Sequence, residues 1–126
     1  VAEAVRDWHD EGIFVSTATS KSERFARLAL ERADILKHID FLGAANFDAG
    51  RLTKVEVISY VLEHAAPPKP LMIGDRKHDY HGAAEFSLPS VAVTWGYGTE
   101  EEWADATYIA HNADELREVV ANHVRG

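Results

Sequence analysis

Two aspartates four residues apart follow a short apolar segment in the middle of the chain. The run from Leu71 to Gly74 predicts a buried strand, and Gly74 permits a tight turn that presents Asp75 at the strand end. If a helix begins there, Asp79 shares a face with Asp75, so the two carboxylates converge. Carboxylates, water and phosphate oxygens suit Mg²⁺, a hard cation that keeps several waters. The alternative is that Asp75 caps the helix and Asp79 is solvated.

A lysine and a hydroxyl-rich loop stand at two other predicted junctions. Lys54 lies in the first turn of a helix that the capping-box spacing of Thr53 and Glu56 predicts. A cation there opposes the helix dipole at a cost of about 0.3 kcal/mol or more, so helix stability does not explain it. The lysine could instead neutralise a phosphate, and the alternative is a solvated surface lysine.

Thr19 and Ser20 belong to the loop 18–21, between a predicted strand and a predicted helix. A hydroxyl beside free backbone N–H groups at such a point is suited to bind a phosphate. The alternative is that Ser20 or Ser22 only caps the helix.

Predicted strands and helices alternate along the chain. Apolar spacing predicts helices over 1–11, 22–33, 53–65, 78–86, 100–103 and 113–124, and strands over 13–18, 41–45, 71–74, 90–94 and 107–110. In the second helix we expect Phe25, Leu28 and Ala29 to face inward. The order predicts a single α/β domain over residues 1–126 with a three-layer, doubly wound (Rossmann-like) parallel sheet. In such sheets ligands bind beyond the carboxyl ends of the strands, where the polar residues above lie.

Composition narrows the class of function. The 126 residues are 46% hydrophobic and 27% charged, as in an ordinary globular domain. The net charge of −8 disfavours binding to a nucleic acid polymer. No apolar run is long enough for a membrane span, and no cysteine is present, which fits a cytoplasmic protein without disulfides. The seven histidines form no HExxH pattern, so a histidine metal site is disfavoured.

Three features follow one another along the chain: the hydroxyl-rich loop 18–21, Lys54, and the loop with Asp75 and Asp79. In this order they resemble the second, third and fourth motifs of the haloacid dehalogenase (HAD) superfamily. VSTATSKSERFA resembles the second motif through Thr19, LTKVEVI the third through Lys54, and LMIGDRKHDYHGA the fourth through Asp75 and Asp79. The segments DAGRLTK, GDRKHD and WGYG look most like the phosphoglycolate phosphatase-like or 5′-nucleotidase-like branch, in which an arginine at the position of Arg51 lies close to the lysine.

This resemblance implies a magnesium-dependent phosphatase that acts on a small phosphorylated metabolite. Asp75 and Asp79 would hold Mg²⁺, while Thr19, Ser20, Arg51 and Lys54 would bind the phosphate. The noncatalytic alternative is a binding or interaction module of the same fold. A phosphoacceptor receiver domain is a third option. It would need an acidic pair after the first strand and a lone acceptor aspartate, whereas the first predicted strand, IFVSTA, ends in hydroxyl residues.

The family's first motif, an apolar strand ending in Asp-x-Asp that supplies the nucleophile, is absent from these residues, as is the helical cap. We therefore expect a HAD-like core that is incomplete at its amino-terminal side and has little activity alone. An upstream segment or a second chain would supply the central strand, between the strands predicted at 13–18 and 71–74.

Overall fold

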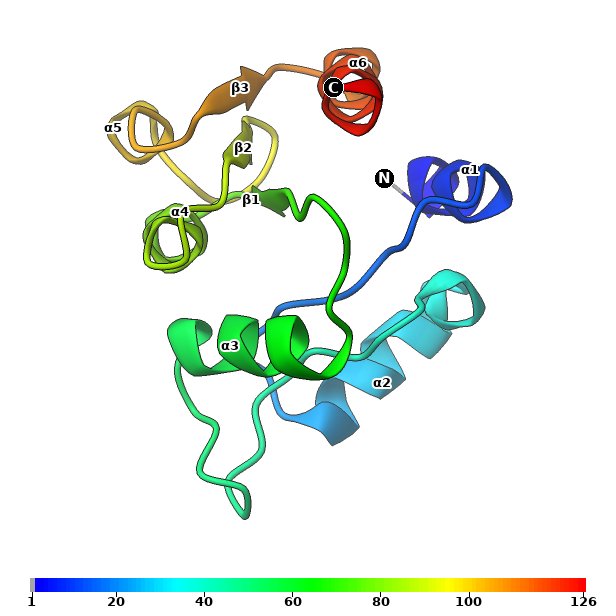
Figure 1. Cartoon of the computed structure of the whole chain (residues 1–126), viewed down its shortest axis with the longest axis vertical. Coiled ribbons are helices and arrows are strands. Elements are labelled where there is room, and N and C mark those ends of the chain that lie inside the picture. Colours follow the sequence, from blue (N-terminus) through cyan, green and yellow to red (C-terminus); the bar gives the residue numbers. More distant parts are fainter. Residues whose placement is uncertain (1) are drawn as a thin grey trace. The chain divides into compact units, whose positions relative to one another are not determined.

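The computed structural model describes residues 2–126, and the chain divides into two compact units, Val1–Pro67 and Pro68–Gly126 (Figure 1). The prediction of a single domain over residues 1–126 stays a prediction. The first unit contains α1 (Ala2–Asp10), α2 (Glu23–Arg32), the 3-10 turn η1 (Leu36–His38) and α3 (Lys54–His64). The second contains β1 (Met72–Gly74), α4 (Lys77–Ala84), β2 (Ser90–Val93), α5 (Glu100–Trp103), β3 (Tyr108–Ala110) and α6 (Ala113–Arg125).

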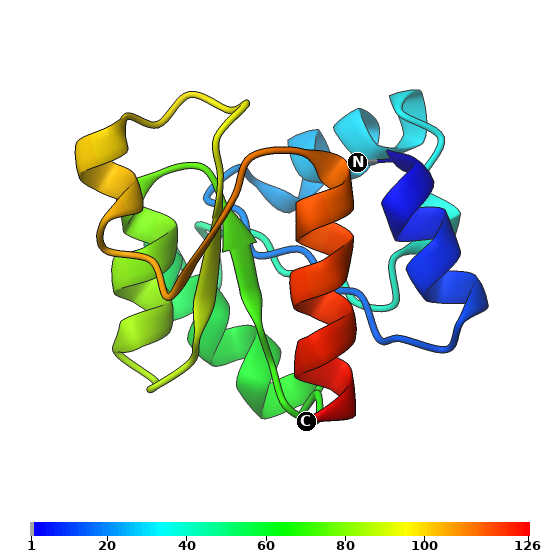
Figure 2. The same cartoon turned by 90° about the horizontal axis from the view of Figure 1, so that it is seen from above.

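The second unit is built on a parallel sheet in the order β1-β2-β3. Ile73 pairs with Val91, and Ala92 pairs with Ile109. All four residues of β2 are buried, as expected for a central strand that is covered on both faces. Helix α4 packs on β1 and β2, α6 packs on β2 and β3, and the two helices lie on opposite sides of the sheet (Figures 1 and 2). The predicted α/β class with a parallel sheet is confirmed.

The core of the second unit explains why these short strands hold together. Tyr80 of α4, Val91 of β2 and Leu116 of α6 are almost fully buried. Burial of such side chains stabilises a fold by about 1.5–3 kcal/mol each. The sheet is therefore packed between two helices, and the loop after β1 starts from a strand that this packing holds in place.

In the first unit, the segments predicted as strands at 13–18 and 41–45 run parallel but form only isolated bridges, such as Ser16 with Phe41. The main-chain amides of Thr17 and Thr19 donate to the carbonyls of Phe41 and Gly43 at 3.2 and 3.1 Å. The amide of Val15 instead donates to the carboxylate of Asp40 at 2.7 Å. The prediction of regular strands was wrong here, because a side chain replaces a backbone partner and a parallel pair alone is marginal.

Helix α2 buries a different face from the predicted one. Ala26 is buried at 4% exposure, whereas Phe25 and Leu28 are 65% and 40% exposed and Ala29 is exposed. Leu30, four residues after Ala26, is half-buried, so the inward stripe runs through positions 26 and 30. The expectation for Phe25, Leu28 and Ala29 was therefore wrong, because the small Ala26 rather than the bulkier side chains makes the close contact.

Helix α3 begins as its capping box predicts. The Thr53 hydroxyl accepts from the amide of Glu56 at 3.2 Å, and the Glu56 carboxylate accepts from the amides of Thr53 and Leu52 at 2.9 and 3.1 Å. These bonds lower the pKa of Glu56, with the Thr53 amide as the largest cause. Val57, Ile58 and Val61 are buried. The box makes Lys54 the first residue of the helix.

Among residues 2–126, no helix is both long and apolar enough to cross a lipid bilayer.

Candidate active site

The loop 18–21 is held by hydrogen bonds within itself and to the neighbouring segment 43–45, which engage the amides of Thr19 and Lys21. The amide of Thr19 donates to Gly43 at 3.1 Å, and the Thr19 hydroxyl accepts from the amide of Lys21 at 3.2 Å. A hydroxyl that accepts one bond keeps its own O–H to donate. Ser20 is exposed. The carbonyl of Lys21 accepts from Ala45 at 2.9 Å, so the neighbouring segment holds both ends of the loop. Its phosphate-binding role stays a prediction.

Lys54 lies beside this loop. Its Nζ donates to the carbonyl of Ala18 at 2.5 Å, and the residue is half-buried. An ammonium group has three N–H donors and can make more than one such bond. The structure therefore brings Lys54 to the residue that precedes Thr19. Their convergence with Asp75 and Asp79 stays a prediction.

Arg51 is held by three contacts inside the first unit. Its Nε donates to the carbonyl of Ala44 at 2.7 Å, and its Nη2 donates to the Glu23 carboxylate at 2.6 Å. The guanidinium carbon lies 3.5 Å from the centre of the Tyr60 ring, which is a cation–π contact. The Arg51 side chain is only 11% exposed. These contacts tie the start of α2, the segment 41–45 and α3 together, and the phosphate-binding role of Arg51 stays a prediction.

Replacing Arg51 with Lys should lower the free energy of unfolding by about 1–3 kcal/mol, because an ammonium cannot make the Nε and Nη2 bonds together or lie flat on Tyr60. Urea denaturation would measure the change. The variant Glu23→Gln should remove part of the same energy, so the double variant should lose less than the sum of the single losses. Strict additivity would contradict this coupling.

The acidic loop after β1 is arranged around its own backbone. The Oδ2 atom of Asp79 accepts from the amides of Asp75 and Arg76 at 3.2 and 3.3 Å, and Asp79 is buried at 8% exposure. A Cβ at Gly74 would overlap the Asp79 carboxylate, so the turn requires glycine there. The Oδ2 atom of Asp75 accepts from the amide of Tyr97 at 2.8 Å. Asp75 in the loop and Asp79 in the first turn of α4 are thus joined at the carboxyl end of β1, and residues 75–79 are called the acidic loop below.

The donor chemistry of this loop fits a hard divalent cation. It offers carboxylate oxygens and no sulfur, and Mg²⁺ needs few protein ligands because it keeps several waters. Residues 2–126 contain no group of three or more His, Cys, Asp or Glu side chains that could hold a metal. A Mg²⁺ ion here would therefore depend on Asp75 and Asp79 with water and substrate oxygens.

Tyr80 secures the same turn from the helix side. Its hydroxyl donates to the carbonyl of Gly74 at 3.1 Å. Burial, followed by the charges of Asp79, Asp75 and Glu102, raises the pKa of Tyr80 to about 12. The phenol therefore stays protonated at neutral pH and can donate to the carbonyl that precedes Asp75.

Glu102 of α5 binds the other end of the acidic loop. Its Oε1 atom accepts from the amide of Lys77 at 2.9 Å and from Nε of Arg76 at 3.0 Å, and its Oε2 atom accepts from the amide of Thr99 at 3.3 Å. These contacts lower the pKa of Glu102 to about 2, with the Lys77 amide as the largest cause and the Arg76 hydrogen bond next. Glu102 therefore fastens the start of α4 to α5.

The lowered pKa of Glu102 predicts acid sensitivity of the second unit. The carboxylate stabilises the fold above its ordinary pKa of 4.5, and this contribution is lost as the pH falls toward about 2. Glu102→Gln should therefore be less stable than the unmodified protein at neutral pH, and the difference should shrink toward the acid end of that window. Urea denaturation at a series of pH values measures it. Glu101→Gln, at an exposed position, is the control, and an equal effect there would contradict the prediction.

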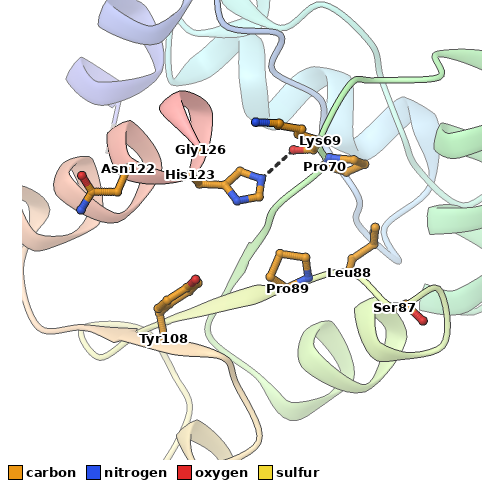
Figure 3. Close-up of a pocket in the computed structure, with 9 residues that line it drawn as sticks. All are labelled: Lys69, Pro70, Ser87, Leu88, Pro89, Tyr108, Asn122, His123 and Gly126. Atoms are coloured by element: carbon orange, nitrogen blue, oxygen red, sulfur yellow. Dashed lines mark hydrogen bonds between the residues drawn. The ribbon is translucent and has the colours of Figure 1, made fainter.

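A separate open groove of about 470 Å³ lies at the other end of the strands in the second unit (Figure 3). Pro70 and Pro89, which precede β1 and β2, line it together with Tyr108 at the start of β3. His123 faces it, and its Nε2 atom lies 2.7 Å from the carbonyl of Lys69 (Figure 3). None of the predicted site residues lines this groove.

Sequence reasoning missed three features of the site region. The spacing of Thr99 and Glu102 is that of a capping box, so it could have marked Glu102 as a helix-start residue. The glycines of WGYG were noticed without their packing against Asp75. No local pattern indicated the pairing of Arg51 with Glu23, which lie 28 residues apart.

The parallel α/β sheet and the acidic loop after β1 are the features expected of the HAD superfamily. The model of the HAD-hydrolase-like family matches residues 22–119, and the chain belongs to this family. The resemblance stated from the sequence is confirmed.

The chain is similar in sequence or structure to several known proteins, including the following three. Tyrosine-protein kinase PtkA of Mycobacterium tuberculosis is 38% identical over an alignment of 120 positions that covers 90% of this chain and 41% of that protein. A 5′-nucleotidase of Pseudomonas aeruginosa is 33% identical over an alignment of 110 positions that covers 84% of this chain and 50% of that protein. A crystal structure of a "predicted phosphatase" from Clostridium acetobutylicum matches with a TM-score of 0.88 and 32% identity, over 95% of this chain and 57% of that one. The chain thus spans about half the length of these relatives.

Proposed function

We propose that the protein containing this chain is a magnesium-dependent phosphatase that hydrolyses a small phosphomonoester. The observation that carries the proposal is the ordered acidic loop at the end of β1, with Asp75 and Asp79 joined through the Asp75 amide, in a chain of the HAD-hydrolase-like family. Parallel α/β sheets bind ligands at that end of their strands. We also propose a cytoplasmic location, which agrees with the lack of cysteine in these 126 residues.

Each predicted site residue would have a distinct task. Asp75 and Asp79 would hold Mg²⁺, which when bound offsets negative charge on the phosphate. Lys54 and the Thr19 hydroxyl would contact the nonbridging oxygens, with the Ser20 amide assisting and Arg51 nearby. The attacking aspartate would come from residues outside these 126, forming an aspartyl-phosphate that water then hydrolyses.

The substrate class we propose is phosphoglycolate or a nucleoside monophosphate. The similarity to a protein named 5′-nucleotidase supports the second of these. A single phosphate group suits a site whose proposed cations are Lys54, Arg51 and a Mg²⁺ ion, because few charges are then needed for balance.

A second candidate is phosphoryl transfer to tyrosine, because the relative that is 38% identical is named a tyrosine-protein kinase. A noncatalytic interaction module is the third. The kinase would need a phosphoryl donor such as a nucleoside triphosphate and would label a tyrosine, whereas the phosphatase would release inorganic phosphate with water alone. The module would do neither.

The test is a phosphate-release screen of the full-length protein against a panel of phosphorylated metabolites. We expect release from a small phosphomonoester with Mg²⁺ and none with EDTA. Release that persists in EDTA, or no release from any member, would overturn the proposal. Incorporation of labelled phosphate from a nucleoside triphosphate into tyrosine, without phosphatase activity, would favour the kinase.

A further inference from the structure

The turn Trp95–Gly98, which follows β2, lies directly against Asp75. The amide of Tyr97 donates to Oδ2 of Asp75 at 2.8 Å, although the two residues are 22 positions apart. Among residues 2–126, the structure gives the other oxygen of Asp75, Oδ1, no hydrogen bond. The two oxygens of this carboxylate therefore have different surroundings.

The two glycines of the turn are required by space. A Cβ at Gly96 would overlap the Cβ and carboxylate of Asp75, and a Cβ at Gly98 would overlap the main-chain carbonyl of the same aspartate. Neither glycine has the positive φ that Gly12 and Gly50 show, so backbone conformation does not explain them. Glycine at both positions lets the turn reach Asp75 closely enough for the Tyr97 bond.

Asp75 is also held by residues of α4, the helix that follows it. Its amide donates to Oδ2 of Asp79 at 3.2 Å, while Tyr80 binds the carbonyl of Gly74, one residue earlier. The backbone of Asp75 is thus fixed by α4 and its side chain by the turn. A carboxylate fixed in this way loses little freedom when it binds a cation, which favours affinity.

We infer that the turn Trp95–Gly98 is a positioning element for the metal site, in which Gly96 and Gly98 let the Tyr97 amide hold one oxygen of Asp75 and leave the other for a divalent cation. This inference rests on the proposed function, because it assigns the cation to Asp75. Gly96 and Gly98 are positioning residues: they act through Asp75 and touch neither metal nor substrate.

The variant Gly96→Ala tests the inference most directly, because the added methyl group would overlap the Cβ and the carboxylate of Asp75, so the turn or the aspartate must shift. Isothermal titration calorimetry of Mg²⁺ into the full-length protein should show affinity weakened by about tenfold or more. Gly12→Ala is the control: its positive φ strains the backbone, but a Cβ there meets nothing within 4 Å. It should lower stability and leave Mg²⁺ affinity unchanged. A folded Gly96→Ala protein with unchanged affinity would overturn the inference.

A measurement on the unmodified protein covers the case in which Gly96→Ala does not fold. In a Mg²⁺ titration followed by amide NMR, the Tyr97 resonance should shift with the dissociation constant found by calorimetry. A Tyr97 resonance that does not move while Asp75 responds would contradict the inference. Asp75→Asn distinguishes failure of the metal role of Asp75 from failure of the positioning role of the turn. If Asp75→Asn binds Mg²⁺ with unchanged affinity, the proposed metal role is wrong. If Asp75→Asn loses affinity while Gly96→Ala keeps it, only the positioning role is rejected.

Discussion

Replacing Asp75 with Asn should abolish magnesium-dependent phosphate release by the full-length protein and leave the protein folded. Asparagine has the same shape and keeps an oxygen that can accept the Tyr97 amide, which lies 2.8 Å from Oδ2 in the structure. It loses the negative charge, and Mg²⁺ binds neutral amide oxygens weakly when few other protein ligands are present. Turnover at several Mg²⁺ concentrations, with circular dichroism for the fold, measures both parts of this prediction.

The control for this variant is Asp114→Asn. Asp114 is exposed in the first turn of α6, so the substitution makes the same chemical change away from the acidic loop. It should lower the stability of α6 slightly, because a carboxylate near a helix start is favourable, and leave turnover unchanged. Full activity of Asp75→Asn at ordinary Mg²⁺ concentrations would remove Asp75 from the proposed mechanism.

The relatives of this chain are named after different reactions, a tyrosine-protein kinase and a 5′-nucleotidase, although they match 90% and 84% of this chain. Both names denote chemistry on a phosphoryl group. A shared fold positions such a site without deciding what attacks the phosphorus or leaves it. The choice between them depends on what accepts the phosphoryl group, which is why an assay must follow both water and tyrosine.

Local signals predicted much of the fold. The capping-box spacing of Thr53 and Glu56 correctly predicted the residue at which α3 begins. Ser22, a residue type that often caps helices, likewise marked the start of α2. Short apolar runs that begin directly after a proline predicted β1 and β2 to within one residue. Such features are encoded by neighbours in the chain, so one sequence suffices to recognise them.

Features that depend on distant partners were not predictable in this way. The segments at 13–18 and 41–45 have the composition of strands, but Asp40 takes the Val15 amide and regular pairing does not form. The contact of Arg51 with Glu23 and the close approach of Gly96 to Asp75 join residues more than 20 positions apart. Their cause is the packing of whole elements, which leaves no period or spacing in the sequence.

The second large effect should come from replacing Lys54 with Met. Methionine keeps the apolar stem of the lysine and removes the charge, so turnover should fall by about a hundredfold or more if the ammonium stabilises the phosphate in the transition state. Stability should change little, because two effects oppose one another. The variant loses the bond to Ala18, which spans 2.5 Å, but also loses a cation at the unfavourable end of α3. Steady-state kinetics and thermal unfolding of the same preparation measure the two quantities.

Lys37→Met is the matched control, since the Lys37 side chain is 64% exposed and its contact with Asp34 is a surface ion pair 3.6 Å long. It should leave both turnover and melting temperature unchanged. If Lys54→Met instead unfolds more easily and keeps normal turnover, the lysine serves only to fasten α3 to the loop at Ala18. A fall in turnover at unchanged melting temperature has no such structural explanation, because the fold is then intact and only the charge beside Thr19 is gone. The pair of measurements therefore decides whether the unfavourable position of Lys54 at the helix start is retained for chemistry.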